Sequence, residues 1–146
     1  MSDSWYSENT ISKLEDQEIQ EGEETRFRIS IGGGELSDYT YQWYYAPSFE
    51  DEGIMIYGAE SYFYTIPSVT AYNSGYYYCE VNDGSKIMRT NKAKLSVYAP
   101  FQTAPVKDQY VNLGNDAVFS VKASGGRVTD YTYQWLFAKM LDFQTR

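Results

Sequence analysis

The chain has 146 residues, of which 42% are hydrophobic and 18% aromatic, and it carries a formal net charge of −8. An acidic surface repels the phosphates of nucleic acids and of anionic membrane surfaces, so binding to either is not expected. No stretch approaches the ~20 apolar residues that a membrane-spanning helix needs, so insertion into a membrane is not expected either. The chain contains no histidine, which excludes Ser-His-Asp and Cys-His catalysis and histidine-ligated metal ions.

The cysteine content and the first residues give an expectation about the compartment. Cys79 is the only cysteine, so an intrachain disulfide is impossible and folding in a reducing compartment is favoured. Residues 1–14 lack the basic and apolar regions of a secretory signal peptide. We therefore expect either that the chain is used without Sec export or that it was cut from a longer precursor.

Strand patterns fill the first two thirds of the chain. Short apolar or alternating runs are separated by turn residues, and no segment keeps a helical period. The expected strands cover residues 25–31, 39–45, 54–57, 62–66, 75–81 and 86–98. Short strands broken by turn signals at this spacing favour an all-β sandwich.

An internal repeat sets the domain organisation. The sequence Asp-Tyr-Thr-Tyr-Gln-Trp at residues 38–43 recurs at residues 130–135, an offset of 92, and the same offset aligns Phe27 with Phe119. We divide the chain into an N-terminal tail (1–10), a first unit (11–98), a linker (99–105) and the first part of a second unit (106–146).

The first unit resembles the immunoglobulin superfamily, in an I-set-like form. Trp43 follows a glycine-rich turn, and residues 73–79, Asn-Ser-Gly-Tyr-Tyr-Tyr-Cys, are similar to the family signature Asp-x-Gly-x-Tyr-x-Cys. The resemblance implies an immunoglobulin-like Greek-key β-sandwich, one complete domain plus a partial second repeat, in which Tyr77 forms a tyrosine corner. Ile29 stands where the family has its strand-B cysteine, and Asn73 replaces the usual aspartate, which puts a common salt bridge in doubt.

Four residues of the first unit are assigned to the structural core. The resemblance places Ile29, Trp43, Tyr77 and Cys79 there, so apolar packing takes the place of the inter-sheet disulfide. Cys79 then acts as a small core residue rather than a nucleophile.

Three tyrosines form a candidate binding site. If Trp43 and Cys79 point inward, a period of two directs Tyr44, Tyr76 and Tyr78 outward on neighbouring strands, where we expect them to be exposed together. Exposed tyrosines favour recognition. The alternative is ordinary cross-strand packing that stiffens the sheet.

No catalytic residue, metal ligand set or cofactor is expected. The carboxylates at residues 21–24 and 50–52 lie in turns without the spacing of a calcium loop, so they are interpreted as solvated charge.

The second unit should be incomplete. Counted from residue 101 to residue 146, linker residues included, it supplies counterparts of strands A, B and C only, and about 46 residues are too few to close a core. It is therefore expected to be a fragment of a longer chain or to be completed by another subunit.

The residues between the motifs are similar to those of immunoglobulin-like repeats in tailed-phage virion proteins, including outer-capsid decoration proteins, and in bacterial surface proteins. This resemblance implies a non-enzymatic virion protein that binds protein or carbohydrate on host or environmental surfaces and contacts capsid or tail proteins. The alternatives are a module of a bacterial cell-surface adhesin and an intracellular structural array.

Overall fold

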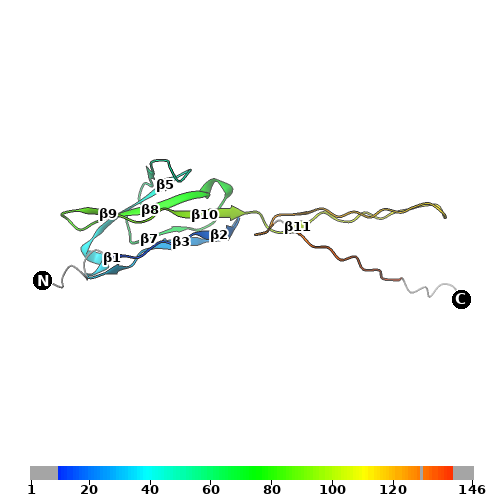
Figure 1. Ribbon diagram of the computed structural model, residues 1–146, viewed down its shortest axis with the longest axis horizontal. Coiled ribbons are helices and arrows are strands. Elements are labelled where there is room, and N and C mark those ends of the chain that lie inside the picture. Colours follow the sequence, from blue (N-terminus) through cyan, green and yellow to red (C-terminus); the bar gives the residue numbers. More distant parts are fainter. Residues whose placement is uncertain (1–9, 129, 140–146) are drawn as a thin grey trace.

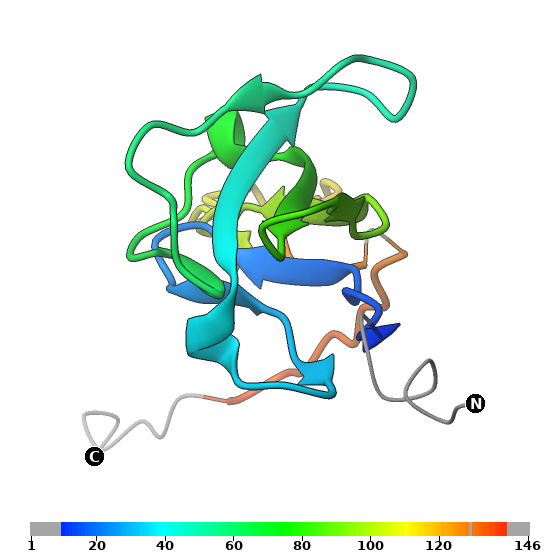
Figure 2. The same ribbon diagram turned by 90° about the vertical axis from the view of Figure 1, so that its left-hand side faces the viewer.

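The computed structural model describes residues 10–128 and 130–139, and its first part is a two-layered β-sandwich (Figures 1 and 2). The larger sheet has the strand order β2-β10-β8-β5-β6, and β9 also pairs with β8. These strands are β2 (Gln17–Gln20), β5 (Thr40–Ala46), β6 (Ile54–Met55), β8 (Gly75–Asn82), β9 (Ile87–Arg89) and β10 (Ala93–Tyr98). The other layer pairs β3 (Thr25–Arg28) with β7 (Phe63–Ile66), and β1 (Thr10–Ile11) with β4 (Ile31–Gly32). The fold is an immunoglobulin-like β-sandwich.

The register between β5 and β8 brings Trp43 and Cys79 together. The two strands are antiparallel, and Trp43 lies directly opposite Cys79. Both side chains are fully buried, and the Trp43 indole Nε1 donates a 2.7 Å hydrogen bond to the carbonyl of Ser61. Phe27 enters from the opposite layer and stacks on Tyr77 at 5.1 Å between ring centroids. The inward faces of the two sheets therefore meet in one aromatic core.

All four residues assigned to the core from the sequence lie in this buried cluster. Ile29 and Cys79 both belong to it, although no disulfide joins the two layers. An aliphatic side chain and a thiol fill the space by packing.

A tyrosine corner closes the turn before β8. The Tyr77 hydroxyl donates a 2.7 Å hydrogen bond to the carbonyl of Asn73, the last residue of a short 3₁₀ helix, η2 (Ala71–Asn73). The Asn73 side-chain oxygen accepts a 2.7 Å hydrogen bond from the Thr70 amide. The side chain of Asn73 thus caps its own helix. No ion pair is formed at this position: among the described residues the ion pairs are Arg89–Glu80 and Arg127–Glu18 only.

The last expected strand, residues 86–98, is divided in two. β9 ends at Arg89 and β10 begins at Ala93. Between them, Thr90 bonds the Cys79 backbone twice: its amide donates to the carbonyl, and its hydroxyl accepts from the amide, both at 2.9 Å. A side chain therefore continues the ladder where regular pairing stops. A second 3₁₀ helix, η1 (Leu36–Asp38), precedes β5 and was not expected from the sequence.

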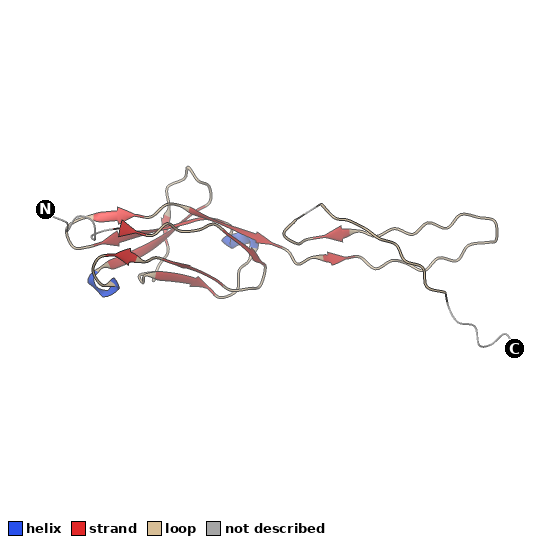
Figure 3. Ribbon diagram, turned by 60° about the horizontal axis from the view of Figure 1, so that its bottom comes forward, coloured by secondary structure: helices blue, strands red, loops and turns tan. Residues whose placement is uncertain are grey.

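The chain beyond residue 98 leaves the sandwich as long extended ribbons (Figures 1 and 3). Within residues 99–128 and 130–139, regular pairing is limited to β11 (Gln102–Thr103) and β12 (Ala123–Ser124). Most of its side chains are exposed, including Phe119 and Trp135. The expected N-terminal tail, apart from Thr10, and the end of the second unit lie outside the described residues.

Candidate binding face

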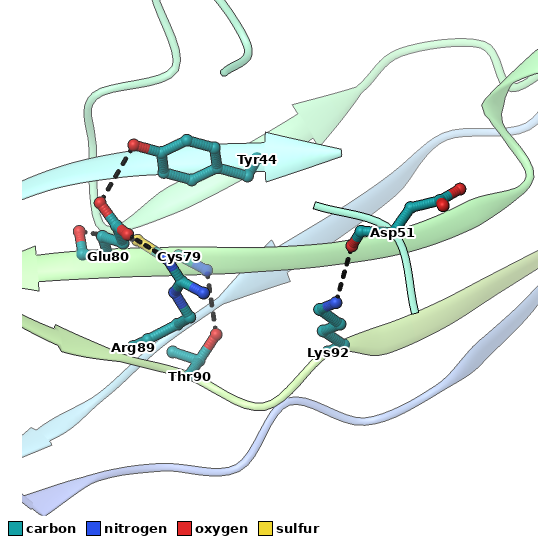
Figure 4. Close-up of polar contacts among 7 residues, drawn as sticks. All are labelled: Tyr44, Asp51, Cys79, Glu80, Arg89, Thr90 and Lys92. Atoms are coloured by element: carbon teal, nitrogen blue, oxygen red, sulfur yellow. Dashed lines mark hydrogen bonds and ion pairs between the residues drawn. The ribbon is translucent and has the colours of Figure 1, made fainter. Parts of the chain in front are cut away.

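The candidate site lies on the outer face of the larger sheet, where β5 and β8 run side by side (Figure 4). Tyr44 and Tyr78 are directly opposite each other in the ladder. Their rings stack with centroids 5.0 Å apart and an angle of 7° between planes. This cross-strand pair follows from the period of two, which directs both side chains away from the core.

A polar chain fixes the orientation of the pair. Tyr44 donates a 3.0 Å hydrogen bond to Glu80, whose other oxygen accepts one of 2.6 Å from Arg89. The Arg89 guanidinium carbon lies 4.8 Å from the centre of the Tyr78 ring, which closes the loop of contacts. Figure 4 shows Glu80 between Tyr44 and Arg89. Because Arg89 is half exposed, this ion pair contributes mainly to geometry rather than to stability.

The contacts within the cluster shift the pKa of two of its members, Tyr44 and Arg89. Burial, followed by the hydrogen bond to Glu80, raises the pKa of the Tyr44 hydroxyl. The hydrogen bond to Glu80 raises the pKa of Arg89. Tyr44 therefore stays protonated and Arg89 stays charged through the physiological pH range.

The loop between β5 and β6 folds over this cluster. The Lys92 ammonium donates hydrogen bonds of 2.7 Å and 2.9 Å to the carbonyls of Phe49 and Asp51. Figure 4 shows Lys92 reaching the loop at Asp51. Further along the loop, Gly53 packs so closely on Tyr78 that a Cβ there would lie 2.6 Å from ring carbon Cε1. As a result Tyr78 is only 2% exposed.

The expectation that Tyr44, Tyr76 and Tyr78 are exposed together is therefore wrong for Tyr78. The period of two assigned the correct side of the sheet, but Gly53 of the loop and the side chains of Arg89 and Lys92 cover the Tyr78 ring. Tyr44 and Tyr76 are half-buried. Whether these tyrosines bind a ligand stays a prediction.

Phe49 replaces Tyr78 as the exposed aromatic of this face, and sequence reasoning missed it. It is 57% exposed, and its ring meets Tyr76 edge-on at 5.6 Å. The only signal was an aromatic residue within an otherwise acidic loop. We define the aromatic face as Tyr44, Phe49 and Tyr76.

Cys79 has the environment of a core residue. It is fully buried, and burial raises the pKa of its thiol to about 12. A thiol with this pKa carries almost no thiolate at neutral pH and is a poor nucleophile. Among the described residues there is no group of three or more Cys, Asp or Glu side chains that could hold a metal ion. Nor does the described part of the chain contain a helix that is long and apolar enough to cross a membrane.

Comparisons with known proteins find similarity at the level of structure only. No family model matches the chain, and no curated protein matches it. Among solved structures, immunoglobulin domains 1–4 of Sidekick-1 share 20% identity with a TM-score of 0.45, covering 65% of this chain and 22% of that chain. A complex of Dpr2 Ig1-Ig2 with DIP-Theta Ig1-Ig3 gives 20% identity and a TM-score of 0.46, covering 65% of this chain and 34% of that chain. The chain thus spans 22% and 34% of the length of these two structures.

Proposed function

We propose that this chain is a non-catalytic adhesion module displayed on a virion, within a capsid decoration or tail protein, that binds protein or carbohydrate weakly on host-cell or environmental surfaces. The observation that carries the proposal is the aromatic face. Phe49 projects into solvent beside Tyr76, and the stacked pair of Tyr44 and Tyr78 forms a rigid base. Rings that are already fixed lose little conformational entropy on binding, and tyrosine hydroxyls add hydrogen bonds.

The proposed affinity is weak because the face is small. One exposed phenylalanine and two half-buried tyrosines bury far less area than a stable protein interface requires. Display of many copies on one particle compensates, since linked weak contacts raise the overall avidity without new contacts.

Support for the virion location comes from the core. Ile29 and Cys79 close the sandwich by packing, so the domain needs no oxidising compartment. A particle assembled in the cytoplasm meets this condition. Capsid or tail genes beside the coding sequence are the expected finding, whereas an export signal in the same reading frame would favour a bacterial surface adhesin.

The adhesive role is tested with beads that carry many copies of the chain. Retention is measured on host cells and on an immobilised glycoprotein, for the native chain and for a double variant, Phe49→Ser with Tyr76→Ser. We expect retention to fall at least tenfold while the melting temperature changes little. The matched control is Tyr72→Ser, since Tyr72 is 93% exposed but lies on η2, outside the aromatic face. Equal retention of the double variant, or an equal loss in the control, would contradict the proposal.

A further inference from the structure

The smaller layer of the sandwich presents two arginines on its outer side. β3 and β7 pair antiparallel in the layer opposite β5 and β8 (Figure 1), and Arg26 and Arg28 alternate with the buried Phe27 along β3. Because successive side chains of a strand point to opposite faces, both guanidinium groups lie on the outer face, where both residues are exposed. This face lies on the other side of the domain from the aromatic face.

Each of these arginines contacts an aromatic ring rather than a carboxylate. The Arg26 guanidinium carbon lies 4.6 Å from the centre of the Phe63 ring, and that of Arg28 lies 5.7 Å from the centre of the Tyr62 ring. The Arg26 Nε also donates a 2.8 Å hydrogen bond to the Thr65 hydroxyl. None of the ion pairs formed within the described residues includes either arginine.

Contact with a ring leaves the binding edge of a guanidinium group available. The ring attracts the flat face of the group, whereas carboxylates and tetrahedral oxyanions bind in its plane through two parallel N–H donors. Two positions apart on one strand, Arg26 and Arg28 are separated by about 7 Å along β3. Since the chain carries a net charge of −8, two neighbouring cations without an acidic partner form a local site for an anion.

A groove begins at Tyr62, beside the arginines. It has a volume of about 490 Å³, which is within the usual range of small-ligand clefts. Its lining comes from η1, from the start of β5 and from the segment before β7, and includes Tyr39, Gln42 and Glu60. Because Tyr62 belongs both to the groove and to the contact with Arg28, the groove and the arginines form one continuous surface.

The walls of the groove are held in place by hydrogen bonds of the protein itself. The Tyr41 hydroxyl donates a 2.5 Å hydrogen bond to the Leu36 carbonyl, which attaches η1 to β5. The Tyr39 hydroxyl donates a 3.0 Å hydrogen bond to the Gly33 carbonyl, which fixes a second ring of the lining. A cleft that is already formed loses little entropy when a ligand binds. Its combination of aromatic rings with polar side chains suits sugar rings, which present both CH groups and hydroxyls.

We propose that this surface, named the arginine groove and defined as Arg26, Arg28, Tyr39, Glu60 and Tyr62, binds an acidic oligosaccharide. Carboxylate or sulfate groups of the sugar bind the two arginines, and a neutral part of the sugar occupies the groove. The charges favour this ligand over an acidic protein segment. A sugar separates its acid groups by hydroxyl-bearing rings, and the Glu60 carboxylate accepts hydrogen bonds from such hydroxyls, whereas it repels an evenly acidic peptide. The site does not depend on the role proposed for the aromatic face.

The test measures binding of three hexasaccharides to the whole chain by calorimetry: a sulfated dextran, an oligogalacturonate and unmodified dextran. We expect at least one acidic sugar to bind at least about tenfold more tightly than the neutral one, and its affinity to fall as salt is raised. Binding of only one acidic sugar would identify sulfate or carboxylate as the preferred group.

Two pairs of substitutions separate the arginines from general charge. Arg26→Gln with Arg28→Gln should weaken binding at least about tenfold. Lys86→Gln with Lys94→Gln is the matched control, because it removes the same charge from two exposed positions outside β3 and β7, and it should change the affinity by less than about twofold. Arg26→Lys with Arg28→Lys should not restore binding, since an ammonium group lacks the planar pair of donors. Melting temperatures of all variants verify that the domain stays folded.

A separate substitution tests the groove. Ser37 is exposed on η1 and lines the groove, so Ser37→Trp places a large side chain inside it. The affinity for the acidic hexasaccharide should then fall to that for the corresponding disaccharide. Ser48→Trp, at an exposed position in the loop between β5 and β6, is the control and should leave the affinity unchanged.

Four results would overturn the proposal. The first is an affinity for the acidic sugars no higher than that for unmodified dextran. The second is an equal loss of affinity in the arginine and lysine variants. The third is equally tight binding of a polyaspartate peptide at the same arginines, which would make an acidic protein the ligand. The fourth is loss of the acidic sugar in Phe49→Ser with Tyr76→Ser, which would place it on the aromatic face instead.

Discussion

Replacement of Gly53 by alanine tests whether the loop over Tyr78 is part of the folded structure. The new Cβ would lie 2.6 Å and 2.7 Å from two ring carbons of Tyr78, well inside van der Waals contact. Gly53 does not have a positive φ, so the substitution adds no backbone strain. The ring has little room to move, because Tyr44 stacks on it at 5.0 Å and Arg89 lies 4.8 Å from its centre. The loop should lift instead.

The cost follows from what the lifted loop uncovers. A tyrosine buries roughly 150–250 Å². If a third of that area returns to water, the loss is about 1–2 kcal/mol at ~25 cal/mol per Å². Overpacking of a well-packed site typically costs about 1–3 kcal/mol, so the two routes agree. For a domain of this size, about 2 kcal/mol corresponds to a fall in melting temperature of roughly 8–16 °C.

Urea unfolding of Gly53→Ala, followed by circular dichroism at pH 7, measures this loss. Gly32→Ala is the matched control. Its Cβ would lie 3.5 Å from the Thr10 Cβ, an ordinary contact, so its free energy of unfolding should change by less than about 0.5 kcal/mol. If Gly53→Ala is as stable as this control, the loop does not pack on Tyr78 as described.

Three further predictions concern the core of the first unit. Ile29→Ala should lose about 2–5 kcal/mol in chemical denaturation, and a loss under about 0.5 kcal/mol would contradict the placement of Ile29 in the core. Tyr77→Phe removes the hydrogen bond to the Asn73 carbonyl and should cost about 0.5–1.5 kcal/mol in the same assay. An unchanged free energy of unfolding would show that the tyrosine corner does not stabilise the domain. Burial raises the pKa of the Cys79 thiol from 9.0 to about 12, so the unfolded chain loses this proton first. The contribution of the thiol to the free energy of unfolding should therefore be fully present below pH 9 and be lost toward pH 12, by about 1.4 kcal/mol per pH unit. Between pH 9 and 10 the free energy of unfolding of Cys79→Ala should fall less steeply with pH than that of the native chain. Equal slopes would refute the role of the thiol.

The sequence predicted the elements that depend on local pattern. The strand that contains Trp43 and the strand that contains Cys79 were placed within a residue or two, because alternation and turn residues identify them. The division at Thr90 was not predictable, since it depends on a hydroxyl group that bonds the backbone of another strand. The short helix η1 was missed because three residues carry no periodic signal.

The sequence predicted where the candidate site lies on the sheet, but not which of its side chains are exposed. A period of two says which side of the sheet a residue occupies, and it placed Tyr44 opposite Tyr78 on the outer side. It says nothing about what lies above that side. Lys92 and Gly53 are distant from Tyr78 in the sequence, and their contacts with the loop and the ring decide its burial. Exposure is therefore a tertiary property that pattern reasoning could not supply.

The two units of this chain show the difference between local pattern and tertiary contacts within one molecule. The same six residues, Asp-Tyr-Thr-Tyr-Gln-Trp, occur in both. In each unit the glutamine amide donates to the next carbonyl, at 3.1 Å from Gln42 and 3.0 Å from Gln134. Only Gln42 also reaches a carbonyl of the following segment, that of Ile56 at 2.8 Å. Local sequence thus sets these short-range contacts, whereas regular strand pairing and burial of the tryptophan are seen only for Trp43, which is covered by strands that follow it in the chain. Because most of the stability of a small domain comes from buried apolar area, the first unit should hold its fold without residues 99–146.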